Sequence, residues 1–170
     1  VIKDYKKAVK YYEIASQLNH QDSSFMLGYL YSNGYEIDVD IQKSIYYYLR
    51  CINIQNKVYI VNDEIITHYS RFYYISCNDL GLIFLINLND IQKASFYIKE
   101  AAFAEYSFAQ NSFGLLNLLY YKKIDIAEHM FTRASKNNFA LSYYNLGYLK
   151  EKEGEIEKSI EYYIKASENE

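Results

Sequence analysis

A glycine that directly follows a bulky apolar residue occurs four times in this sequence, and its spacing constrains the fold more than any other feature. The intervals between the four glycines are 53, 33 and 33 residues. A period of this length is typical of repeat proteins in which every repeat is a pair of helices. Glycine costs a helix about 1 kcal/mol relative to alanine, so its recurrence needs a structural reason. We expect that reason to be close contact with a second helix at Gly28, Gly81, Gly114 and Gly147.

A second pattern accompanies the glycines, in which two small residues are seven positions apart and bulky residues lie between them. Residues with this separation share one face of a helix. Small side chains there allow a partner helix to approach, and the bulky side chains fill the groove beside them. The small pairs are Ala8 and Ala15, Ser44 and Cys51, Ala94 and Ala101, Ala127 and Ala134, and Ser159 and Ala166.

Together the two patterns predict helix pairs that bury their apolar faces only by stacking on neighbouring pairs. We use the name A helix for a helix that carries the glycine, and B helix for a helix that carries the small residues. The A helices are predicted at 22–33, 70–87, 106–121 and 139–152. The B helices are predicted at 4–17, 39–52, 90–104, 124–136 and 155–168.

These helices are predicted to form one domain over residues 1–170. It begins with a half repeat at 4–17 and continues with repeats at 22–52, 70–104, 106–136 and 139–168. The wide first interval leaves an insertion at about 53–69, for which we expect a one-turn extension or an extra helix rather than a structureless loop. In that segment Asn62-Asp63 could cap a helix that continues through Phe72. Because Val1 already lies in a helical pattern, we expect the chain to be a segment of a longer protein.

Several residues between the predicted helices are typical of helix ends. Gly34 and Gly154 follow A helices, and glycine commonly ends a helix in the left-handed conformation. Asp40, Asp90 and Asp125 lie near the starts of B helices, where a carboxylate complements exposed N–H groups.

Composition excludes several classes of protein. The net charge of −3 does not supply the positive field of a nucleic-acid binder. No apolar stretch approaches the roughly 20 residues of a membrane-spanning helix. Cys51 and Cys77 form no CxxC pair, and we expect buried free thiols. No Asn-x-Ser/Thr glycosylation site is present, which favours a cytoplasmic location over a secreted one.

The first complete unit resembles a known repeat family. It reads Ser24-Phe-Met-Leu-Gly-Tyr-Leu-Tyr-Ser-Asn-Gly34 and then Asp40-Ile-Gln-Lys-Ser-Ile-Tyr-Tyr-Tyr48. This resembles the Sel-1-like repeat, a relative of the tetratricopeptide repeat, and residues 4–12 match the second half of the same pattern. The later units, with their 33-residue spacing, are nearer to the tetratricopeptide length. The resemblance implies an all-α fold, a right-handed α-solenoid of stacked antiparallel helix pairs.

By the same resemblance, the A helices line a concave face. The residues three before and one after each glycine would point into it as partner-binding residues. They are Phe25, Tyr29, Asn78, Leu82, Asn111, Leu115, Tyr144 and Tyr148. An amide such as Asn78 or Asn111 can hold a peptide backbone through both a donor and an acceptor. Core packing between repeats remains the alternative for the aromatic residues and leucines, and solvated surface for the two asparagines. No lysine or arginine occupies these positions, which disfavours a clamp for acidic chain ends.

No residue pattern indicates catalysis, a cofactor or a metal site. His20, His68 and His129 lie in different repeats, and no nucleophile, phosphate-loop or paired acidic motif is present. The resemblance implies a scaffold or adaptor that binds other proteins or peptides without acting as an enzyme. A structural spacer within a larger protein is the alternative, and an RNA-reading helical array ranks below both.

Charge is distributed unevenly along the chain. Residues 1–10 carry four lysines and one aspartate, whereas residues 151–170 carry seven glutamates and three lysines. Such ends could favour head-to-tail self-association or contact with adjoining repeats, with solvated helix faces as the default interpretation.

Overall fold

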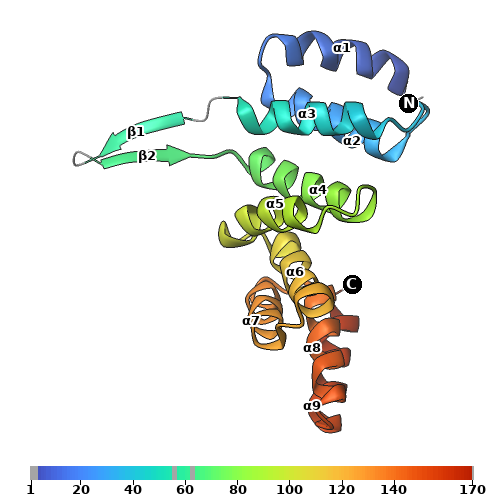
Figure 1. Cartoon of the computed structure of the whole chain (residues 1–170), viewed down its shortest axis with the longest axis vertical. Helices are drawn as coiled ribbons and strands as arrows, with labels where there is room; N and C mark the ends of the chain where they lie inside the picture. The colour runs from blue at the N-terminus through green and yellow to red at the C-terminus, as the bar shows by residue number, and fades with distance from the viewer. Residues whose placement is uncertain (1–3, 55–56, 62–63, 170) are drawn as a thin grey trace. The chain divides into compact units, whose positions relative to one another are not determined.

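The computed structural model describes residues 4–54, 57–61 and 64–169, and side chains are described outside 55–68. It contains two compact units, Val1–Asp90 and Ile91–Glu170. Figure 1 shows the order of the elements along the chain. Each unit is described by itself.

The first unit contains α1 (Tyr5–Gln17), α2 (Gln21–Asn33), α3 (Ile41–Asn53), strands β1 (Lys57–Val61) and β2 (Glu64–His68), and α4 (Arg71–Ile86). Neighbouring helices pack in order, α1 on α2, α2 on α3 and α3 on α4. Part of its core is a cluster of Val9, Leu27, Leu30 and Tyr31.

The second unit contains α5 (Ile91–Phe103), α6 (Ser107–Leu116), the π-helical turn η1 (Asn117–Tyr121), α7 (Ile124–Ser135), α8 (Ala140–Lys152) and α9 (Ile156–Glu168). Each helix again packs on the next one along the chain. Ala127, Phe131, Leu146 and Leu149 form a core cluster between α7 and α8.

The predicted reason for the repeated glycines is confirmed at three positions. A methyl group added at Gly28 would lie 2.7 Å from the ring of Tyr48, at Gly114 2.5 Å from Phe131, and at Gly147 2.7 Å from Tyr163. Each of these aromatic residues lies four positions after the first small residue of its B helix. The glycine therefore makes room for one particular ring of the paired helix.

Several helix ends also agree with the predictions made from the sequence. The Asp40 side chain accepts a hydrogen bond from the Lys43 backbone N–H at 2.9 Å and so caps α3. Gly34 ends α2 with a φ of +72°, and Gly154 follows α8 with a φ of +82°. The turn after η1 has no glycine, and Lys122 takes the left-handed conformation there with a φ of +56°.

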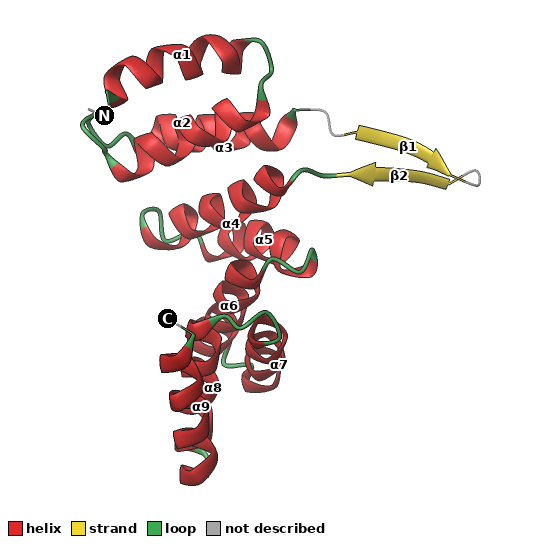
Figure 2. Ribbon diagram, turned by 180° about the vertical axis from the view of Figure 1, so that it is seen from behind, coloured by secondary structure: helices red, strands yellow, loops and turns green. Residues whose placement is uncertain are grey.

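The prediction of helix in the insertion is wrong. Residues 57–61 and 64–68 pair as an antiparallel β-hairpin, with Val58 opposite Thr67 and Ile60 opposite Ile65. Figure 2 shows the two strands, which come between α3 and α4 in the order of the chain. The cause is the density of β-branched residues, which favour a pleated strand over a helix. The cap expected at Asn62-Asp63 lies outside the described residues, and α4 begins only at Arg71.

The predicted class, an all-α helical repeat solenoid, is confirmed apart from this hairpin. Cys51 and Cys77 are buried free thiols, as expected. Among the described residues, no helix is long and apolar enough to cross a membrane. The single domain over 1–170 stays a prediction, since α4 and α5 of the expected repeat 70–104 fall in different units.

Candidate protein-binding surfaces

The residues that directly follow the glycines differ in exposure. Tyr29 on α2 and Tyr148 on α8 remain 36% and 40% exposed, and Leu82 on α4 is half-buried. Leu115 on α6 is also half-buried, and it packs against the core cluster of Phe131 and its neighbours. The two tyrosines are therefore the more open of these four predicted positions, and the two leucines are each half-buried.

Two of the four residues that lie three before the glycines contact the next A helix of their own unit. Phe25 on α2 lies 5.1 Å from Phe72 of α4, measured between ring centroids. Asn111 on α6 is 5% exposed, and its side-chain oxygen accepts a hydrogen bond from Asn145 of α8 at 2.8 Å. Tyr144 on the last A helix is 54% exposed. Sequence spacing could place these residues on one face but could not show that a following helix covers it.

Asn78 is buried at 3% exposure, so its amide has little surface to offer a partner. It donates a hydrogen bond to Oδ1 of Asp79 at 3.2 Å. Among the described residues, no partner lies within hydrogen-bonding distance of its Oδ1 atom. We assign Asn78 and Asn111 to packing between helices, and the exposed tyrosines to the candidate surface.

Four aromatic rings of the first unit contact one another in sequence, two on α2, one just after α2 and one on α1. The Phe25 and Tyr29 rings lie 6.3 Å apart, and the Tyr29 and Tyr35 rings are stacked at 5.7 Å. Tyr35 also stacks on Tyr5 at 5.7 Å. The hydroxyls of Tyr29 and Tyr35 are 3.1 Å apart, and this hydrogen bond raises the pKa of Tyr29. These contacts hold Tyr29 in one orientation while leaving part of it exposed.

A cavity of about 280 Å³ opens beside Tyr29 and Leu82, two of the predicted residues of the first unit. Its wall also includes Tyr48 and Asp79, a residue that the sequence reasoning missed. The Tyr48 hydroxyl donates a hydrogen bond to Oδ2 of Asp79 at 3.2 Å. Burial raises the pKa of Asp79 above its usual value, and the hydrogen bonds from Asn78 and Tyr48 oppose that shift. The sequence signal that could have identified Asp79 is a carboxylate two residues before the A-helix glycine, here Gly81.

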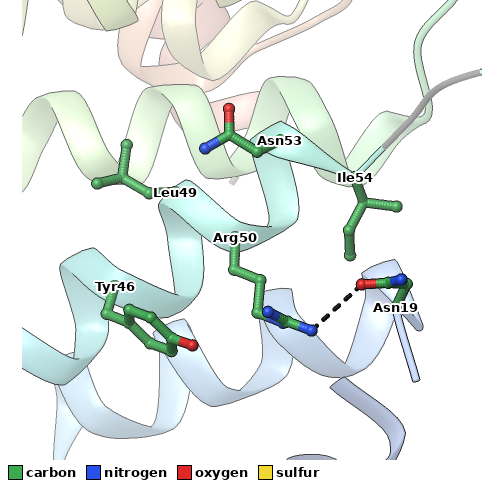
Figure 3. Close-up of a pocket in the computed structure, with 6 residues that line it drawn as sticks. All are labelled: Asn19, Tyr46, Leu49, Arg50, Asn53 and Ile54. Carbon is green, nitrogen blue, oxygen red and sulfur yellow. Dashed lines mark hydrogen bonds between the residues drawn. The ribbon is translucent and has the colours of Figure 1, made fainter. Parts of the chain in front are cut away.

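A second cavity of the first unit, about 800 Å³, lies beside Arg50 of α3 (Figure 3). The Arg50 guanidinium donates to the Ser16 carbonyl oxygen at 2.7 and 3.0 Å and to Asn19 Oδ1 at 3.2 Å. A cation at the carbonyl end of α1 is favourable because the helix dipole is negative there. Through these hydrogen bonds Arg50 connects α3 to the C-terminal end of α1.

In the second unit, a cavity of about 620 Å³ lies between α5, η1 and α7. Phe103, Phe113 and Met130 form part of its wall, with Lys99 and Lys123 also lining it. The ammonium groups of these lysines lie 5.7 Å from the Phe103 ring and 5.9 Å from the Tyr121 ring, respectively. This basic and apolar surface was not anticipated from the sequence, because the B helices α5 and α7 were treated only as packing elements.

The acidic C-terminal helices partly neutralise their own charge. Lys150 of α8 lies 2.7 Å from a carboxylate oxygen of Glu128 and 2.8 Å from one of Glu153. Its side chain is only 15% exposed, and these carboxylates raise its pKa. Glu155 pairs with Lys158. Head-to-tail self-association stays a prediction.

Among the described residues, no group of three or more histidine, cysteine, aspartate or glutamate side chains could hold a metal ion. The arrangement instead consists of helix pairs packed through small residues, with aromatic side chains left exposed beside the glycines. These features define the chain as an α-helical repeat protein.

Comparison with known families makes the assignment specific. Residues 1–20 and 21–50 match the family model of the Sel1 repeat, and residues 140–169 match that of the tetratricopeptide repeat. Over these segments the chain is similar to the Sel1 repeat and the tetratricopeptide repeat, as its sequence predicted. No curated protein matches the sequence.

Solved structures show the same fold. A Sel1 repeat protein from Oxalobacter formigenes has a TM-score of 0.75 and 23% identity, over 99% of this chain and 66% of that one. A protective antigen of uropathogenic Escherichia coli strains, which displays an SLR fold, has a TM-score of 0.69 and 17% identity, over 94% and 33%. The immunity protein Pa5087 from Pseudomonas aeruginosa has a TM-score of 0.65 and 18% identity, over 99% and 60%. The chain spans no more than about two thirds of each of these structures.

Repeat folds of this family generally mediate protein–protein interactions, and they are typically not enzymes. That statement concerns the family, and the surface used by this chain has to be argued from its own residues.

Proposed function

We propose that this chain is a scaffold or adaptor that binds a peptide or helix of a partner protein through residues of its A helices. The first A-helix surface consists of Tyr29, Leu82 and the cavity beside them. The second A-helix surface consists of Tyr144 and Tyr148 on α8. The proposal gives the chain no catalytic role.

The observation that carries the proposal is the exposure of tyrosines at equivalent positions beside the A-helix glycines. Tyr29 and Tyr148 each follow a glycine directly and are 36% and 40% exposed. Tyrosine is enriched among residues that dominate binding energy, because it buries a large ring and still offers a hydroxyl. An exposed helix position does not need an aromatic residue for stability, since alanine or lysine would fit there and expose less apolar surface.

Preorganisation supports the first surface in particular. The Tyr29 ring stacks on Tyr35, and the two hydroxyls are 3.1 Å apart. A side chain that is already held in one orientation loses little conformational entropy when a partner covers it. Tyr29 can therefore contribute more of its burial energy to binding than a freely rotating surface residue.

In the second surface, Tyr144 packs on Tyr163 with ring centroids 5.4 Å apart, and the Lys152 ammonium lies 5.4 Å from the Tyr148 ring centroid. Both tyrosines are thus supported from one side and open on the other. This is the arrangement expected of residues that receive a partner helix or strand.

The test is selection of a binding peptide from a displayed library, followed by measurement of its dissociation constant. We expect Tyr29→Ala or Tyr148→Ala to weaken binding at least about tenfold, since hot-spot residues contribute more than about 1.4 kcal/mol. The control is Tyr46→Ala, which removes a tyrosine that is 56% exposed on B helix α3. A structural spacer would show no preference between these variants. Equal affinities for all three, or a larger loss for Tyr46→Ala, would overturn the proposal.

A further inference from the structure

Asp79 carries a half-buried carboxyl group to which the fold gives no positively charged partner among the described residues. Its recorded hydrogen bonds come from neutral donors, the Tyr48 hydroxyl and the Asn78 amide, each at 3.2 Å. Among the residues that the structure describes, no ion pair involves Asp79. Partial burial is costly for a carboxylate unless a cation or several donors compensate it.

A cation can reach Asp79 from solvent through a cavity. Asp79 lines the cavity of about 280 Å³ that Tyr29 and Leu82 also line. Ile83 and Ile86 of α4 contribute apolar wall, and Ile86 is 75% exposed. Ser32 and Asn87 add polar atoms that can accept hydrogen bonds. The cavity therefore combines an apolar entrance with a carboxyl group and neutral acceptors.

We propose that this cavity accepts an arginine side chain of the partner protein, with the guanidinium on the Asp79 carboxylate. The inference rests on the proposed function, since Tyr29 and Leu82 belong to the first A-helix surface. The aliphatic part of the arginine lies along Leu82 and Ile83, as long basic side chains commonly do on apolar surfaces.

The wall residues favour arginine over other cations. A guanidinium is planar and carries five donors, so it can bind a carboxylate and still donate to neighbouring hydroxyl or amide oxygens. It also stacks on aromatic rings, and the partly exposed Tyr29 ring lines the same cavity. A divalent metal ion would require more oxygen ligands than the single carboxylate of this wall provides.

The desolvation of the Asp79 carboxyl group supports the assignment of an arginine partner. Desolvation raises the pKa of Asp79, and the hydrogen bonds from Asn78 and Tyr48 offset only part of that rise. A guanidinium placed within about 4 Å would favour the ionised form and lower that pKa.

The experiment titrates the protein with N-acetyl-arginine amide and, as the matched control, N-acetyl-citrulline amide, which has the same shape without the charge. NMR spectra follow the backbone amides of α2 and α4 and the side-chain carboxyl carbon of Asp79. We expect saturable shifts at Tyr29, Asp79 and Leu82 with the arginine probe, at least about fivefold weaker binding of the citrulline probe, and a lower Asp79 pKa in the presence of arginine.

Asp79→Asn tests the same point by substitution. It keeps the shape of the side chain, and the Tyr48 hydroxyl can still donate to the amide oxygen. We expect the shifts caused by the arginine probe to be lost while the rest of the spectrum is kept. The carboxyl-carbon titration of the unmodified protein gives an answer even where the variant does not fold.

Equal shifts with arginine and citrulline, absence of saturable shifts near Asp79, or an unchanged Asp79 pKa would overturn the arginine assignment. None of these results affects the loss of peptide affinity expected for Tyr29→Ala or Tyr148→Ala. Failure of the arginine site and failure of the protein-binding function are therefore distinguished by separate measurements.

Discussion

The ring of Tyr48 on α3 lies against Gly28 of α2, so closely that a methyl group on the glycine would be 2.7 Å from the ring. The same ring is 1% exposed, and its hydroxyl binds Asp79 of α4. Tyr48 thus connects three helices of the first unit. The Tyr48 side chain therefore both occupies the space that Gly28 leaves free and lines the cavity of the first A-helix surface.

Replacement of Gly28 by alanine is expected to destabilise the protein. Overpacking in a core costs about 1–3 kcal/mol, against about 1 kcal/mol gained from the better helix propensity of alanine. We therefore expect a net loss of up to about 2 kcal/mol in the free energy of unfolding, measured with urea.

Gly147→Ala is the matched comparison, because Gly147 faces the ring of Tyr163 at the same 2.7 Å. Tyr163 is only half-buried, so its ring can move towards solvent. The backbone oxygen of Ser159, 3.2 Å from the added methyl, needs only a small adjustment. We expect a smaller loss than at Gly28. A larger loss for Gly147→Ala would contradict the role given to the buried Tyr48 ring.

Asp79 gives a prediction about pH. Its pKa is raised in the folded state by burial, whereas an unfolded aspartate has a pKa of about 3.9. The unfolded state loses its proton first as the pH rises, so the contribution of Asp79 to stability is greatest below pH 4. This contribution declines as the pH passes through the raised folded pKa.

Asp79→Asn removes this ionisation. The free energy of unfolding should therefore rise in the variant relative to the unmodified protein between about pH 4 and neutral pH, and the difference should grow with pH. Urea unfolding at several pH values checks it. A difference that is constant, or that shrinks as the pH rises, would show that burial does not raise the pKa of Asp79.

Arg50 is expected to hold α1 on the first unit. Its guanidinium makes two hydrogen bonds to the Ser16 carbonyl, and hydrogen bonds to charged groups are worth about 1.5–3 kcal/mol. In Arg50→Lys we expect lower hydrogen-exchange protection in α1, because an ammonium cannot reproduce the planar pair of donors.

The control is Lys43→Ala, which removes a lysine that is 57% exposed and pairs with Asp40 at 3.6 Å. Exposed pairs of this kind contribute about 0–1 kcal/mol. Protection in α1 should be unchanged by that substitution. Equal effects of the two substitutions would mean that Arg50 does not anchor α1.

The helices could be predicted because their determinants are local. Gly28, Ser44 and Tyr48 encode one helix–helix contact through their types and spacing, and the same pattern recurs at Gly114 and Gly147. Asp40 and Gly34 similarly encode helix ends through their own hydrogen bonds and backbone conformation.

The remaining features depend on contacts that spacing does not contain. Whether Phe25 or Asn111 faces solvent is decided by α4 and α8, which cover them. The cavity at Asp79 is formed by side chains of α2, α3 and α4 together. The strands at 57–61 and 64–68 were not predicted because the helical pattern of the flanking repeats was extended into the insertion, although β-branched residues there favour strands.

The central claim is that a partner binds the A helices rather than the B helices. Site-specific photo-cross-linking to the selected peptide tests it most directly, with p-benzoylphenylalanine placed at Tyr29 or Tyr148. Tyr46 on α3 and Phe96 on α5, which are 56% and 68% exposed, receive the same group as controls. We predict cross-links from Tyr29 or Tyr148 and none above background from Tyr46 or Phe96. Cross-links from the two B-helix positions alone would contradict the account.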